Sequence, residues 1–156
     1  MGLFDFLFKK DEYQQGDILQ EKYEYLLDKA YNATIKDDDI SQLDENEKVL
    51  YVLFTFNLEV QNGGLCQFFV NSSREYAPLV SDYLEVVGAL EHKELYDNFV
   101  IDNKLDLTDL SSFEITDLSE FKEKNNEYPF DEFDDLFYDL KNLEDYLYTF
   151  IKKKKI

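Results

Sequence analysis

The chain has 156 residues, of which 35 are acidic and 16 basic, so that its net charge is −19 at pH 7. Hydrophobic residues make up 44% and aromatic residues 17% of the sequence, which excludes a disordered acidic tail because such tails lack large apolar side chains. An acidic surface repels nucleic acid and anionic membranes. The composition therefore favours a basic protein as partner, with no direct binding of nucleic acid.

Residues 1–17 form an N-terminal segment that begins with an apolar run made of Leu3, Phe4, Phe6, Leu7 and Phe8. The basic residues Lys9 and Lys10 follow this run instead of preceding it, which argues against a secretory signal. No run approaches the length of a membrane span, and we expect a cytoplasmic protein. We expect the segment to dock onto the rest of the protein or onto a second copy in a homodimer. A flexible segment or a weak membrane-surface anchor is the alternative.

The next segment, Ile18 to Tyr31, is predicted to be a helix because its apolar residues recur on one face. These residues are Ile18, Leu19, Tyr23, Leu26, Leu27 and Ala30. The acidic run of Asp37, Asp38 and Asp39 marks the loop that follows. We expect a solvated turn there, with weak binding of a divalent ion or contact with a basic partner as alternatives.

A long helix is predicted to begin at Asp44, since Asp44 and Glu47 have the spacing of an N-terminal capping box. Apolar side chains on most sides of the segment from Val49 to Gln61 indicate that this helix is buried. Asn62-Gly63-Gly64 can end it in a left-handed cap, after which Leu65 to Asn71 forms a second short helix. The single cysteine, Cys66, lies among apolar neighbours and is expected to be buried.

The order of residues around this corner is specific enough to suggest a family. The residues concerned are Asn62-Gly63-Gly64, Gln67-Phe68-Phe69 and Asn71, and one helix later Gly88 in Val86-Val87-Gly88-Ala89-Leu90. With these residues the region resembles the DNA mimic protein nineteen family of small acidic bacterial proteins. The resemblance covers Asp44 to Val100. It implies mimicry of duplex DNA, aimed at a basic DNA-binding protein such as a helix-turn-helix repressor in transcription regulation. From the residues alone, the motif is a tight helix corner in which Gln67 and Asn71 satisfy loose backbone groups, and binding of a ligand by its amides is the alternative.

Helices are also predicted for the segments that follow. Ser72-Ser73 caps one, with Pro78 in its first turn and a buried stripe of Tyr76, Leu79, Val80, Tyr83, Leu84, Val87 and Leu90. His92 to Val100 is a shorter helix with His92 on its polar edge. Residues 102–116 form either a loop with one helical turn or an irregular strand. Ser119 is predicted to cap a short helix that ends near Asn125 and Asn126.

The last helix is predicted to begin at Pro129 and to continue unbroken for five turns, with apolar residues from Phe133 to Ile151 facing the core. Acidic residues occupy another face: Asp131, Asp135, Asp139 and Asp145, flanked by Glu132, Asp134 and Glu144. Carboxylates four residues apart lie about 6 Å apart along a helix, and phosphates follow one DNA strand every ~3.4 Å. This stripe is therefore a candidate surface for a basic partner.

Patterns for catalysis and cofactor binding are missing from the sequence. With one histidine there is no zinc-binding motif, and neither glycine-rich phosphate-binding pattern occurs. We therefore expect a single all-α domain of about seven or eight helices, spanning residues 1–156, that acts by binding without a cofactor or a metal. An immunity protein or antitoxin that masks a basic nuclease toxin is the first alternative, and an enzyme with a carboxylate or metal site is the second.

Overall fold

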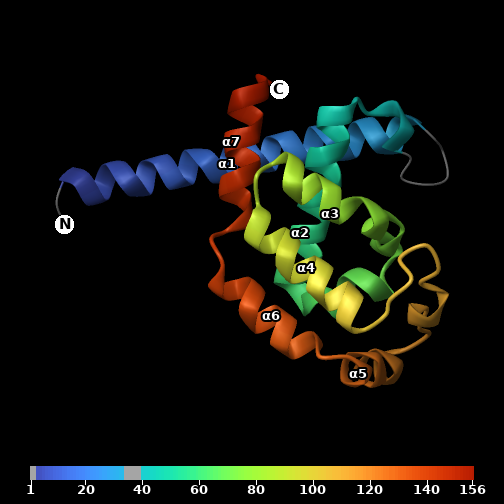
Figure 1. Cartoon of the computed structure of the whole chain (residues 1–156). Coiled ribbons are helices and arrows are strands. Elements are labelled where there is room, and N and C mark those ends of the chain that lie inside the picture. Colours follow the sequence, from blue (N-terminus) through green and yellow to red (C-terminus); the bar gives the residue numbers. More distant parts are fainter. Residues whose placement is uncertain (1–2, 34–39) are drawn as a thin grey trace. The chain divides into compact units, whose positions relative to one another are not determined.

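A computed structural model describes residues 3–33 and 40–156; for residues 3–13 and 31–33 only the backbone is described. The described residues form seven α-helices and three short 3₁₀ helices, without a strand (Figure 1). In chain order these are α1 (Leu3–Ala33), η1 (Ile40–Gln42), α2 (Glu45–Val70), η2 (Ser72–Tyr76), α3 (Ala77–Val86), α4 (Leu90–Asp102), η3 (Ser111–Phe113), α5 (Leu118–Glu127), α6 (Phe130–Asp139) and α7 (Leu143–Lys154). The predicted all-α class is confirmed.

Contacts divide the chain into two units, whose boundaries fall inside α2 and α7. We call Met1–Tyr51 with Leu147–Ile156 the terminal unit and Val52–Tyr146 the central unit. The central unit carries 22 acidic and 6 basic residues, a net charge of −16, whereas the terminal unit carries 13 acidic and 10 basic residues, a net charge of −3. Most of the negative charge of the protein therefore belongs to the central unit.

In the terminal unit, the predicted capping box is present at the start of α2. The backbone N–H of Glu47 donates to Asp44 Oδ1 and the backbone N–H of Asp44 donates to Glu47 Oε2, each at 2.9 Å. Lys29 of α1 donates to the same buried carboxylate of Glu47 at 2.7 Å. Since these bonds join two segments that are 18 residues apart, Glu47 both starts α2 and ties it to α1.

Helix α1 is longer than the predicted helix from Ile18 to Tyr31, because it begins at Leu3. Leu19, Leu26 and Ala30 are buried as expected, while Ile18 is exposed. The expected docking of Leu3, Phe4, Phe6, Leu7 and Phe8 concerns side chains outside the described ones. The same is true of Asp37, Asp38 and Asp39, which lie outside the described residues altogether.

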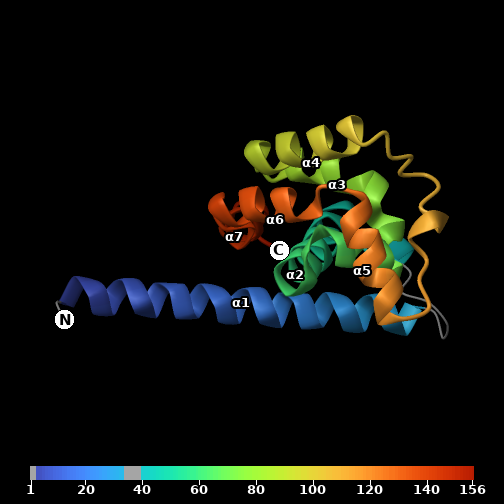
Figure 2. The ribbon, with the colours of Figure 1, turned by 90° about the horizontal axis from the view of Figure 1, so that it is seen from below.

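Aromatic rings fill the core of the central unit, where α4 lies beside α3 and α6, and α5 beside α6 (Figures 1 and 2). Phe56 of α2 meets the rings of Phe68, Tyr96 and Phe137 edge to face, with ring centroids 5.1–6.0 Å apart. Phe69, Phe99, Phe113, Phe130 and Phe133 continue this cluster through α2, α4, η3 and α6. Such ring pairs add stability beyond that of the apolar area they bury. The aromatic side chains therefore contribute strongly to the stability of the central unit.

The predicted corner after Gln61 is confirmed by the backbone of α2. Gly64 has φ 79° and ψ 177°, and with Gly63 it breaks α2 into a long first segment and a short second one that begins at Leu65. Phe68 and Phe69, on the second segment, are fully buried. Cys66 is buried too, and burial raises the pKa of its thiol to about 12.

Helix α3 ends earlier than predicted. Gly88 has φ 80°, and the bonds from its N–H to the carbonyl of Glu85 and from the Ala89 N–H to that of Leu84 close a Schellman motif. As a result, Leu90 begins α4 and is 59% exposed, so its predicted place in the buried stripe is wrong. Ser73 does not cap α3, because its hydroxyl donates to the carbonyl of Phe68.

The residues after α4 decide between two predicted alternatives and correct one further prediction. Residues 102–116 contain the helical turn η3 and no strand, which confirms the first alternative. Helix α5 is capped by Asp117 and not by Ser119, because Asp117 Oδ1 accepts the backbone N–H groups of Ser119 and Glu120 at 2.8 and 3.0 Å. The cap lies two residues before the predicted one.

The predicted five-turn final helix is wrong, because it is interrupted at residues 140–142 and divided into α6 and α7. Asn142 Oδ1 accepts the backbone N–H of Glu144 at 3.1 Å, as an N-terminal cap does. Asparagine is one of the preferred capping residues, so a signal for this break was present in the sequence. Leu136, predicted to face the core, is 56% exposed on α6.

The capping box leads to a prediction about Glu47. Replacing Glu47 with Ala should lower the free energy of unfolding by about 1 kcal/mol or more, because a helix cap and the partner of Lys29 are lost together. Glu45→Ala is the matched control, since Glu45 pairs with Lys48 at the exposed start of the same helix and should cost much less. Chemical denaturation measures both, and equal effects would contradict a special role for Glu47.

Candidate partner-binding surface

Four carboxylates line the solvent side of α6: Asp131, Glu132, Asp135 and Asp139 are all exposed. We call these four residues the acidic face of α6. Asp131 accepts a hydrogen bond from the Asn125 amide at 3.1 Å. None of the four forms an ion pair with any side chain that the structure describes, so their charge is not neutralised within the described part of the protein.

Asp134, predicted to belong to the same stripe, has a different environment. It is half-buried, and its Oδ1 accepts the backbone N–H of Leu65, 69 residues away, at 2.9 Å. Burial raises the pKa of Asp134, the bond from Leu65 lowers it, and the neighbouring charges of Asp131 and Asp135 raise it. Asp134 therefore attaches α6 to the start of the second segment of α2, where an acid also suits the helix dipole.

Glu144 and Asp145 lie on α7 and not on α6, as a result of the break between these helices. Both are half-buried in the first turn of α7. The structure thus brings together four of the seven predicted stripe residues, places Asp134 in a contact with α2, and moves Glu144 and Asp145 to another helix.

The amides of the corner motif converge on one carboxylate, that of Glu59. Gln67 donates to Glu59 at 2.6 Å and Asn71 donates to it at 3.0 Å, while the hydroxyl of Ser73 lies 3.3 Å from it. The amides were expected to satisfy backbone groups, and in the structure they hold a side chain. Asn62, by contrast, is exposed. No local pattern of residues indicates the Glu59 contact, because Glu59 and its partners lie on opposite sides of the corner, whose angle depends on the glycines.

The two glycines of the corner are surrounded by these same side chains. A Cβ at Gly63 would collide with the amide of Gln67, and a Cβ at Gly64 would collide with the carboxylate of Asp134. Gly64 also has positive φ, which side chains disfavour. Gly88 has nearly the same φ, but a Cβ there would meet nothing.

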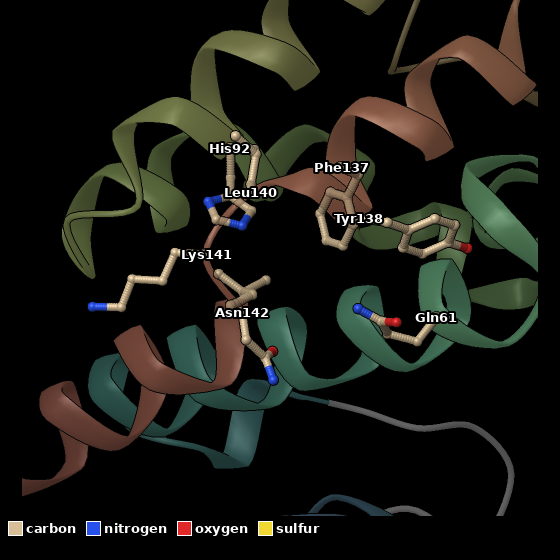
Figure 3. A pocket seen from close by; sticks show the side chains of 8 residues that line it. Gln61, His92, Phe137, Tyr138, Leu140, Lys141 and Asn142 are labelled. Carbon is tan, nitrogen blue, oxygen red and sulfur yellow. The ribbon is translucent and has the colours of Figure 1, made fainter.

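A hollow of about 380 Å³ lies beside the break between α6 and α7, and Figure 3 shows it from close by. The rings of His92 and Phe137 meet edge to face there with centroids 5.3 Å apart, whereas the side chain of Lys141 extends away from the His92 ring. Tyr138 lines the other side and donates to the carbonyl of Val60 at 2.7 Å.

His92 is buried at 2% exposure, which contradicts its predicted place on the polar edge of α4. Its ring packs edge to face on Phe137 and Tyr146, and neither ring nitrogen makes a hydrogen bond of ordinary geometry. Burial lowers the pKa of His92, an effect that the backbone carbonyl of Lys141 and the charge of Glu91 only partly oppose. The spacing of His92, Tyr96 and Phe99, all buried on α4, was the signal for this position.

The two left-handed glycines allow a matched comparison. Gly88→Ala should lower the free energy of unfolding by about 1 kcal/mol through backbone strain alone. Gly64→Ala should cost clearly more, because φ 79° with ψ 177° is open essentially only to glycine and because the new methyl group also collides with Asp134. Adding Asp134→Ala to Gly64→Ala should then cost less than the sum of the two single changes, which denaturation of the four variants measures. Equal costs for the two glycine variants would refute the collision.

The buried imidazole leads to a prediction about pH. Because its pKa is lowered in the folded protein, His92 resists protonation there, whereas the unfolded chain binds a proton below the ordinary pKa of about 6.5. The free energy of unfolding should therefore fall as the pH drops from 7.5 to 5.5. In His92→Leu this fall should be smaller, as measured by denaturation at both pH values. An identical fall in both proteins would show that His92 does not titrate as described.

No group of acidic, histidine or cysteine side chains that could hold a metal ion occurs among the described residues. In the same part of the chain, no helix is both long and apolar enough to cross a membrane. Neither a curated protein nor a solved structure matches the chain. A family model does match residues 41–154, which includes α2 to α7 and extends well beyond the segment from Asp44 to Val100 that carried the resemblance in sequence. The chain therefore belongs to the family described as DMP19-like protein.

Proposed function

We propose that this protein is a DNA mimic that occupies the DNA-binding surface of a basic protein and acts by binding, without catalysis. The observation that carries the proposal is the acidic face of α6, four exposed carboxylates without an ion pair among the described residues. Membership of the DMP19-like family supports a role of this class.

The spacing of the carboxylates supports mimicry of a phosphate backbone. Asp131, Asp135 and Asp139 follow one another at four-residue steps, so that they span about 12 Å along α6. Phosphates on one strand of duplex DNA cover the same length in three to four steps of ~3.4 Å. Long Lys and Arg side chains of a DNA-binding surface can adapt to this difference in spacing.

The charge of the whole central unit supports the same proposal. A net charge of −16 on 95 residues produces a field that attracts a basic surface before contact is made, and such steering mainly raises the association rate. We infer that the partner is a DNA-binding protein such as a helix-turn-helix repressor, which would be kept from its operator. A basic nuclease toxin is the alternative partner for the same surface.

The proposal predicts the behaviour of a variant in which Asp131, Asp135 and Asp139 are all replaced by Asn. The variant should fold normally and bind the partner roughly tenfold more weakly at low salt, mainly through slower association. The partner is first obtained by affinity capture from cells of the host, and its identity as a repressor or a nuclease separates the two alternatives. Binding kinetics are then measured at two salt concentrations, with duplex DNA as competitor.

The control for this experiment removes three charges elsewhere in the central unit. Glu85 on α3 and Glu91 and Glu94 on α4 are exposed, and replacing all three with Gln changes the net charge by the same amount. This variant should retain most of the affinity. Binding that is insensitive to salt and that DNA does not displace would refute mimicry, and equal losses in the two variants would refute α6 as the contact surface.

A further inference from the structure

A second hollow, of about 550 Å³, lies between the end of α2 and the segment that leads into α5. Its apolar lining comes from Val70, Ile115, Leu118 and Phe121. We call this hollow the Leu118 groove. Leu118 is 88% exposed, the largest exposed fraction among the large hydrophobic side chains that the structure describes. Leu118 is not an isolated exposed residue, because it lines a hollow together with three other apolar side chains, and apolar surface gathered in a groove is typical of binding sites.

The walls of the groove are held in place by polar contacts. Arg74 donates to the backbone carbonyls of Val70 and Asn71 at 3.0 and 3.1 Å, and its other terminal nitrogen pairs with Glu114 at 3.2 Å. Glu59 holds Gln67 and Asn71 on the α2 side. Because these bonds link the end of α2 to the segment before α5, the groove exists before any partner arrives, which reduces the cost of ordering it.

Carboxylates lie at and beside the groove, and among them Glu114 is already paired with Arg74. Asp117 lines it directly, and Glu120 and Glu114 stand next to its lining residues in the chain. Hydrogen bonds from the side chain of Ser119 and the backbone N–H of Glu120 lower the pKa of Asp117, so that it stays ionised at neutral pH. An occupant that suits the groove is therefore apolar where it enters and basic beside that point.

We propose that the Leu118 groove takes apolar side chains from an amphipathic helix of the basic partner, with Lys or Arg flanking them. The inference rests on the proposed function and adds to it: carboxylates steer the partner, while the groove supplies an apolar contact that phosphates alone do not offer. The volume lies within the range of sites that enclose small ligands, which leaves room for apolar side chains one helical turn apart. A basic helix without such apolar side chains is then bound more weakly than a helix of the same charge that carries them.

Two synthetic helical peptides test the inference without a known partner. Both are rich in lysine and carry the same net charge, but one has leucines at i and i+4 where the other has serines. At low salt the protein should bind both, and the leucine peptide about tenfold more tightly or better, since burying one leucine side chain is enough for such a difference. Fluorescence anisotropy of labelled peptides measures both affinities, and circular dichroism checks that the peptides are equally helical.

Two variants locate the effect. Leu118→Gln should remove the preference for the leucine peptide and leave the affinity for the serine peptide unchanged. Ile101→Gln is the matched control, because Ile101 is 69% exposed on α4 and does not line the groove, so this change should preserve the preference.

The outcomes separate this inference from the proposed function. Equal affinities for the two peptides, or a preference that survives Leu118→Gln, would overturn the role of the groove and leave the acidic surface untouched. Failure of both peptides to bind at low salt would overturn the acidic surface itself. Tight binding of the leucine peptide alone, unaffected by salt, would support the groove and refute electrostatic mimicry.

Discussion

The hydrogen bond from the backbone N–H of Leu65 to the carboxylate of Asp134 is the contact on which the arrangement of the central unit depends. It fixes α6 against the corner of α2, and it requires a glycine at position 64, because a side chain there would occupy the space of the carboxylate. Burial of Phe130, Phe133 and Phe137 leaves the acidic face of α6 on the solvent side. The corner motif and the acidic face therefore meet at Asp134, a half-buried acid on the same helix as the exposed ones.

The stability of the central unit is a balance between repulsion and aromatic packing. With 22 acidic and 6 basic residues, its carboxylates repel one another, and this repulsion is strongest at low ionic strength. The ring cluster that extends from Phe56 to Phe137 opposes it with contacts that do not depend on salt. A protein whose carboxylates are to attract a basic partner needs such a core, because internal ion pairs would stabilise the fold only by neutralising those carboxylates.

Features encoded by neighbouring residues could be predicted from the sequence, and features that depend on distant contacts could not. The capping box of Asp44 and Glu47 and the corner at Gly64 involve residues within one helical turn, and both are present. The break before α7 also had a local signal, the capping residue Asn142, which the continuous apolar spacing of the segment concealed. The role of Asp134 had none, because its partner is 69 residues away and its neighbours in sequence are exposed acids. The burial of His92 did have a local signal, its spacing with Tyr96 and Phe99 on α4, but the rings from α6 and α7 that cover it belong to distant parts of the sequence.

The single cysteine lies one residue beyond Leu65, at the corner held by Asp134. Burial is the main cause of the raised pKa of Cys66, and the charge of Asp134 is the next. A thiol in this state reacts with disulfide reagents only after the short helix from Leu65 to Val70 separates from its surroundings. The rate of thiol exchange at Cys66 thus reports how often the corner opens. Comparing this rate with and without a partner bound to the acidic face of α6 shows whether binding keeps the corner closed.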